Sequence, residues 1–193
     1  MDSLVRDYFT TLQGVLDRLP VGNITRVVEE ILEAGGRGST IFLLGNGGSA
    51  ATASHFACDL AKGTQVRGQR SFRVIALTDN VPLITAWGND TAYDRIFAEQ
   101  LRPLVQANDL VIGISGSGNS MNVIKAIEYA NKNRGKTVGI SGYDGGKLLK
   151  CAQENIHVPS FHMQQVEDVH LLVLHLLMCL IRDIDSPKLR TSK

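Results

Sequence analysis

The sequence has almost no excess of charge of either sign. Its 193 residues carry 20 Lys and Arg against 19 Asp and Glu, and the formal net charge is +1. Without a basic surplus, long-range electrostatics does not draw the chain to nucleic acid or to an anionic membrane. We therefore expect neither as a partner, and instead expect a small molecule or another protein.

Cysteines are few, and long apolar runs are missing. The three cysteines, Cys58, Cys151 and Cys179, are odd in number and far apart, which favours a reducing compartment over a disulfide framework. Residues 1–7 lack the basic and apolar stretches of a signal peptide, and the apolar runs are short or interrupted by polar residues. We expect a cytoplasmic protein without a membrane span.

Internal repeats, low-complexity tracts and long linkers are also absent. The hydrophobic share of 44% is sufficient for the core of one domain. We expect that domain to cover residues 1–185, with N-terminal helices over residues 1–38 and an α/β sandwich with a C-terminal helix over residues 39–185. Residues 186–193 are predicted to form a frayed tail.

The spacing of apolar residues predicts a pair of N-terminal helices followed by an α/β fold. The first forty residues have the period of two amphipathic helices, which Pro20 separates and Gly35–Gly38 ends. Further on, short apolar runs alternate with helical segments, which is typical of a five-stranded parallel sheet with helices on both faces. Val166–Ile184 predicts a largely buried helix or one at a subunit contact. The predicted strands are Thr40–Leu44, Phe72–Leu77, Leu110–Ile114, Thr137–Ile140 and Ile156–Pro159.

Two glycine-rich turns follow predicted strands and precede predicted helices. The first is Gly45–Ser49 (Gly-Asn-Gly-Gly-Ser), and the second is Ser115–Ser120 (Ser-Gly-Ser-Gly-Asn-Ser). Each alone is an ordinary helix-capping turn. Together they lie at the carboxyl edge of a parallel sheet, where backbone N–H groups and helix dipoles bind anions. Neither has the lysine of a P-loop or the full dinucleotide fingerprint, so we expect a phosphomonoester and no nucleotide cofactor.

The ordered motifs of this chain resemble those of the sugar isomerase (SIS) domain and, more narrowly, of the phosphoheptose isomerase family. The resemblance rests on Gly45–Ser49 with Ala53–Ala57, Gly88–Asp90, Gly113–Ser120 and Gly142–Lys147. It implies a flavodoxin-like sandwich, a homotetramer with sites at subunit interfaces, and conversion of sedoheptulose 7-phosphate to an aldoheptose 7-phosphate. The implied substrate-binding residues are Asn46, Gly47, Ser49, Asn89, Asp90, Ser115, Ser117, Ser120 and Glu167, with the four serines on the phosphate.

Ketose–aldose exchange needs a base that moves a proton between C1 and C2, and an acid or a metal that stabilises the developing oxygen charge. His55 and Asp59 are four residues apart and share a helix face. Glu167 and His175 are eight apart on the last helix, which separates them by about 80° around the axis and about 12 Å along it. We expect Asp59 as base and His175 as acid.

His55, Asp59, Glu167 and His175 also form a credible ligand set for a divalent metal, with Zn²⁺ foremost. Each has a plainer interpretation: Asp59 as a solvated carboxylate, Glu167 as an acid favoured at a helix N-terminus, and His175 as a core histidine.

The family carries His, Glu, Gln and His at the positions of His55, Asp59, Glu167 and His175, so this chain departs at Asp59 and Glu167, and also at Gln164, where Asp often stands. Shortening Glu to Asp withdraws the carboxylate by about 1 Å, which can cost about a hundredfold in rate. The alternative is therefore a silent regulatory SIS protein, like the relative that binds a bacterial replication initiator. Because all four side chains can still bind a metal or transfer a proton, we favour an enzyme.

Overall fold

The computed structural model describes residues 1–65 and 71–185, and the predicted tail over residues 186–193 lies outside them. The predicted helix pair is confirmed as α1 (Asp2–Leu16) and α2 (Val21–Arg37). The helix α2 continues through Gly35 and Gly36 and ends within the predicted stop at Gly35–Gly38. It ends at Gly38, whose φ of 70° is the left-handed conformation typical of a C-cap glycine.

The five predicted strands form one parallel sheet in the order β2-β1-β3-β4-β5. The last strand begins and ends two residues earlier than predicted. Beyond it, the Val158 N–H still donates to the Ser141 carbonyl, but the next N–H on that side, from Ser160, turns back to the Val158 carbonyl. The strands are β1 (Thr40–Leu44), β2 (Arg73–Ala76), β3 (Leu110–Ser115), β4 (Lys136–Ser141) and β5 (Glu154–His157).

Helices cover both faces of the sheet, as predicted, because apolar residues point alternately to the two sides. In β1, Ile41 and Leu43 join the core formed with α2, α3 and α8, whereas Phe42 and Leu44 join a second core with α5, α6 and α7. The bounds are α3 (Gly48–Cys58), η1 (Asp59–Gly63), α4 (Val81–Asp90), η2 (Tyr93–Arg95), α5 (Ile96–Leu101), α6 (Met121–Lys132), α7 (Leu148–Cys151) and α8 (Met163–Asp185).

The long helix α8 is buried along one stripe only. Val166, Val169 and Val173 are fully buried, whereas Leu171, Leu172 and Leu176 on the outer side are 36–43% exposed. The prediction of a largely buried helix is therefore half right. By length and composition alone, Met163–Ile184 could cross a membrane, but this is weak support for a span because a core helix passes the same test.

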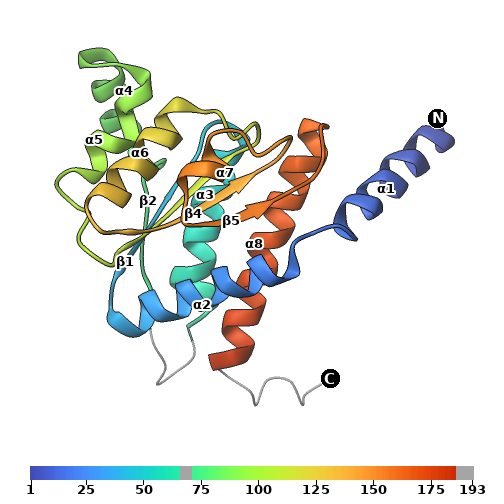
Figure 1. Ribbon diagram of the computed structural model, residues 1–193, viewed down its shortest axis with the longest axis horizontal. Coiled ribbons are helices and arrows are strands. Elements are labelled where there is room, and N and C mark those ends of the chain that lie inside the picture. Colours follow the sequence, from blue (N-terminus) through green and yellow to red (C-terminus); the bar gives the residue numbers. More distant parts are fainter. Residues whose placement is uncertain (66–70, 186–193) are drawn as a thin grey trace.

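The sheet order places the two glycine-rich turns beside each other. Strand β1 pairs with both β2 and β3, so the chain direction across the sheet reverses at β1 and β3. Ligands of doubly wound sheets bind at this switch point, beyond the carboxyl ends of the strands. Gly45–Ser49 leaves β1 there and Ser115–Ser120 leaves β3. The helix α1 extends away from this layered body, as Figure 1 shows.

Candidate active site

The turn after β1 is shaped by its glycines. A Cβ at Gly45 would lie 2.8 Å from the backbone carbon and oxygen of Ser49, so the turn folds back on itself at a distance that only glycine allows. Gly47 has a φ of 54°, which is also a glycine conformation. The turn therefore passes directly into α3, and buried Ser49 lies in the first helical turn.

The turn after β3 is held by its own serines. The Ser115 hydroxyl donates to the Ser120 hydroxyl over 2.9 Å, and Ser117 Oγ accepts the Asn119 N–H over 3.2 Å. Gly118 has a φ of 67°, and a Cβ there would lie 2.0 Å from the Gly145 carbonyl oxygen. The Gly142–Lys147 motif thus packs against this turn and supports its shape.

Two asparagines link the turns. Asn46 Nδ2 donates to Asn122 Oδ1 over 2.9 Å, and Asn122 Nδ2 donates to Asn46 Oδ1 over 2.8 Å. The Tyr93 hydroxyl also donates to Asn46 Oδ1, over 3.0 Å. Asn122 and Tyr93 were not predicted from the sequence. The sequence offered one signal for them: Asn122 lies shortly after Ser120, and Tyr93 lies shortly after Asp90, so each follows a motif closely.

Asn89 and Asp90 lie exposed at the end of α4, where the Asn89 amide donates to Asp90 Oδ1 over 2.9 Å. The residue from this segment that reaches the first turn is Tyr93, three positions further on. The predicted substrate contacts of Asn89 and Asp90 stay predictions.

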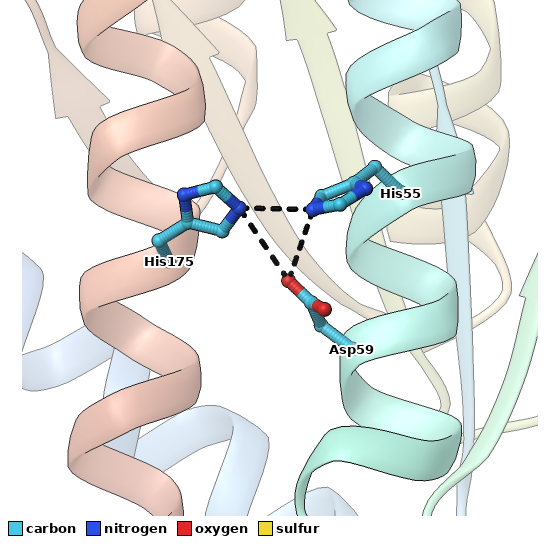
Figure 2. Close-up of side chains that lie close together, drawn as sticks. All are labelled: His55, Asp59 and His175. Atoms are coloured by element: carbon cyan, nitrogen blue, oxygen red, sulfur yellow. Dashed lines mark hydrogen bonds and ion pairs between the residues drawn. The ribbon is translucent and has the colours of Figure 1, made fainter.

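His55, Asp59 and His175 come together between α3 and α8 (Figure 2). The Nε2 atoms of His55 and His175 are 2.9 Å apart, and Asp59 Oδ2 lies 3.5 Å from the first and 3.8 Å from the second. The predicted common face of His55 and Asp59 is confirmed. Asp59 opens the π-helical turn η1, in which the Thr64 N–H bonds to the Asp59 carbonyl, and such turns are frequent at functional sites.

The electrostatics of this triad suit a cation. The Asp59 side chain is 19% exposed, and its Oδ2 is buried without a hydrogen-bond partner among the described residues. A buried carboxylate oxygen that faces two imidazole nitrogens is satisfied by a positive ion, and nitrogen and oxygen donors of this kind bind Zn²⁺. The plainer interpretations fail for two residues, because Asp59 is not solvated and His175 is 46% exposed rather than in the core.

Glu167 lies apart from the triad. Its carboxylate packs on Gly48, where an added Cβ would lie 3.0–3.1 Å from the carboxylate atoms. Glu167 is therefore beside the N-terminus of α3, whose dipole favours a negative charge, whereas His175 is beside His55 further along. The helices α3 and α8 run side by side in the same direction. Glu167 and His175, eight residues apart on α8, therefore contact different points along α3.

Known proteins are similar to this chain in both sequence and fold. The SIS domain family matches residues 7–142. The phosphoheptose isomerase of Aliarcobacter butzleri is 41% identical over 173 residues, 89% of each chain, and that of Syntrophotalea carbinolica is 36% identical over 97% of each chain. The chain belongs to the phosphoheptose isomerase family of SIS domain proteins. The solved phosphoheptose isomerase of Neisseria gonorrhoeae has a TM-score of 0.86 at 30% identity, covering 93% of this chain and 97% of that one.

Two of the predicted site features lie along one stretch of helix in this chain. The helix α3 begins in the first glycine turn with Ser49, and it carries His55 about two turns later and Asp59 about one turn after that. The glycine turn and the triad therefore lie at opposite ends of one stretch of helix.

Proposed function

We propose that this chain is an aldose–ketose isomerase that converts sedoheptulose 7-phosphate to an aldoheptose 7-phosphate through an enediol. The relatives that are 41% and 36% identical carry the name phosphoheptose isomerase. The observation that carries the proposal is the placement of the triad about two turns along α3 from the glycine turn. A substrate with phosphate at one end and a carbonyl group near the other matches that separation.

In this proposal the phosphate binds between the two turns. The hydroxyls of Ser49, Ser115, Ser117 and Ser120 share its charge with backbone N–H groups at the starts of α3 and α6. Asn46, Gly47, Asn89 and Asp90 contact the rest of the substrate. The structure supports this at Gly47 of the first turn, where an added Cβ would meet nothing within 4 Å, so the backbone there is open to a ligand.

The carbonyl end of the substrate then lies at the triad. Asp59 takes a proton from C1 of the ketose, and His175 donates a proton to the C2 oxygen, which gives the enediol. Asp59 returns its proton to C2 while the C1 hydroxyl gives its proton back to His175, which gives the aldose. Both side chains end in their starting state, and no atom is gained or lost.

We also propose an alternative state of the site in which His55, Asp59 and His175 hold a divalent metal ion, with Zn²⁺ foremost; in that state the ion would replace the proton on His175, because a histidine nitrogen bound to a metal has no proton to donate. Such an ion would supply Lewis-acid polarisation of the substrate carbonyl. Three protein ligands with an open position are typical of catalytic zinc sites. Glu167 was predicted as a fourth ligand, but its carboxylate lies against Gly48 and not with the triad. Its role as a metal ligand stays a prediction.

We further propose a cytoplasmic homotetramer in which residues 1–185 of each copy form one domain. The support is a set of exposed apolar side chains on α1 and α8, which a neighbouring copy would cover. They are Leu4, Val5, Phe9, Leu171, Leu172 and Leu176.

The test is turnover of sedoheptulose 7-phosphate by the purified chain and by Asp59→Asn and His175→Gln. We expect each substitution to lower kcat by about 100-fold or more, because positioned acids and bases contribute about 10²–10⁴-fold. Glu33→Gln, on the surface of α2, is the control and should keep full activity. Full activity in either triad variant would remove that residue's role. Binding without turnover in the wild type, with any divalent ion, would instead identify a silent phosphosugar-binding protein.

A further inference from the structure

The pair of amides that links the two turns has a fixed orientation. Asn122 is only 2% exposed, and its Oδ1 accepts the backbone N–H of Val123 over 2.9 Å. A backbone N–H can only donate, so the carbonyl oxygen of the Asn122 amide must face it, and the Asn122 NH₂ must face Asn46. The backbone at the start of α6 therefore determines how the Asn122 amide is turned.

This orientation passes on to Asn46. Because Asn122 presents one oxygen and one N–H to Asn46, the Asn46 amide must return one N–H and its oxygen. Asn46 Oδ1 then accepts from both Asn122 and Tyr93, which uses both of its lone pairs. Of the two Asn46 N–H groups, one bonds to Asn122, and the other has no partner within the described part of the chain.

We propose that Asn122 and Tyr93 are positioning residues that lock Asn46 so that its second N–H points to an oxygen of the bound sugar phosphate. This inference rests on the proposed function for the identity of the ligand. Asn46 is then a donor only, suited to an anionic or hydroxyl oxygen and unable to accept a bond from the substrate. The lock also ties the β1 turn to the start of α6, so that both halves of the phosphate site keep one spacing.

The test is a double-mutant cycle with Asn46→Ala, Asn122→Ala and the double variant. If Asn122 acts through Asn46, each single substitution raises KM for sedoheptulose 7-phosphate by about 10- to 100-fold with kcat changed less. The double variant is then no worse than Asn46→Ala. Tyr93→Phe removes one of the two hydrogen bonds that Asn46 Oδ1 accepts, and it should raise KM by a smaller factor.

Asn131→Ala is the matched control. Asn131 lies near the other end of α6, and its amide bonds to Thr137, Cys151 and Gln153. We expect it to lower thermal stability and leave KM unchanged. A purely structural role for Asn122 would give the opposite result. The effects of Asn46→Ala and Asn122→Ala would then be additive and would follow thermal stability. They would lower the fraction of active protein rather than raise KM.

A second readout separates this inference from the proposed function. The affinity for inorganic phosphate, and for sedoheptulose 7-phosphate in the Asp59→Asn background, is measured by calorimetry through the same cycle. Non-additive losses for either ligand support the lock even if the wild type turns over nothing. If Asn122→Ala binds both ligands as tightly as the wild type does, the inference that Asn122 positions Asn46 is overturned, whatever the activity.

Discussion

Gly45 has a steric role that no other residue type can fill. An alanine Cβ there would lie 2.8 Å from backbone atoms of Ser49, so Gly45→Ala must move the turn or the start of α3. We expect a loss of about 1 to 3 kcal/mol in unfolding free energy, as for an overpacked core, together with a raised KM. Urea unfolding and steady-state kinetics measure both.

Gly22→Ala is the control for that substitution. A Cβ at Gly22 would meet nothing within 4 Å, so we expect unchanged kinetics and a stability that is equal or higher by up to about 1 kcal/mol. Equal stabilities for the two alanine variants would show that the turn does not depend on Gly45.

Glu167 gives a second prediction for a single residue. Its carboxylate lies beside the α3 terminus at which we place the phosphate, so Glu167→Gln removes a like charge. We expect inorganic phosphate to bind several-fold more tightly, and the metal content to stay at the wild-type level while His175→Ala loses it. Loss of metal from Glu167→Gln would instead identify Glu167 as a ligand. Calorimetry measures the phosphate affinity, and elemental analysis measures the metal content.

At the scale of elements, α8 carries a buried histidine on its inner side. His170 is 1% exposed, and burial lowers its pKa from 6.5 to about 4, partly opposed by the backbone of Ser141. The unfolded chain therefore binds a proton at this residue between pH 6.5 and 4 that the folded chain does not. The resulting stability is complete above pH 6.5 and is lost as the pH falls toward 4, by about 3 kcal/mol in total.

His170→Leu should remove that part of the pH dependence. We expect the difference in unfolding free energy between pH 7.5 and pH 4.5 to shrink by about 2 to 3 kcal/mol relative to wild type. His162→Asn changes an exposed histidine and should leave the difference unchanged. The same dependence in His170→Leu as in wild type would contradict the assignment.

The elements were predicted well where the apolar period was long, and less well where tertiary contacts set their ends. The strands and the long helices follow from hydrophobic spacing alone. The π-helical turn at Asp59 depends on a bond from Thr64, and the meeting of His55 with His175 depends on how α3 packs on α8. Asn122 and Tyr93 were missed for the same reason, since their partner Asn46 lies on a different element.

At the scale of the molecule, α1 exposes large apolar side chains away from the body. Leu4 and Phe9 are 67% and 63% exposed, and burying them between copies would add hydrophobic stabilisation. We expect light scattering after size exclusion to give four times the chain mass of 21.0 kDa. Leu4→Asp with Phe9→Asp should give smaller species. A wild-type monomer at working concentrations would contradict the tetramer.

The central claim is that the chain moves a proton between C1 and C2 of a sugar phosphate. An NMR time course with sedoheptulose 7-phosphate in deuterated buffer, with and without added Zn²⁺, tests it most directly. We predict an aldoheptose 7-phosphate that carries deuterium at C2 and that does not form with Asp59→Asn. Sedoheptulose 7-phosphate that broadens on binding but stays unconverted and undeuterated, with or without the metal, would contradict the account.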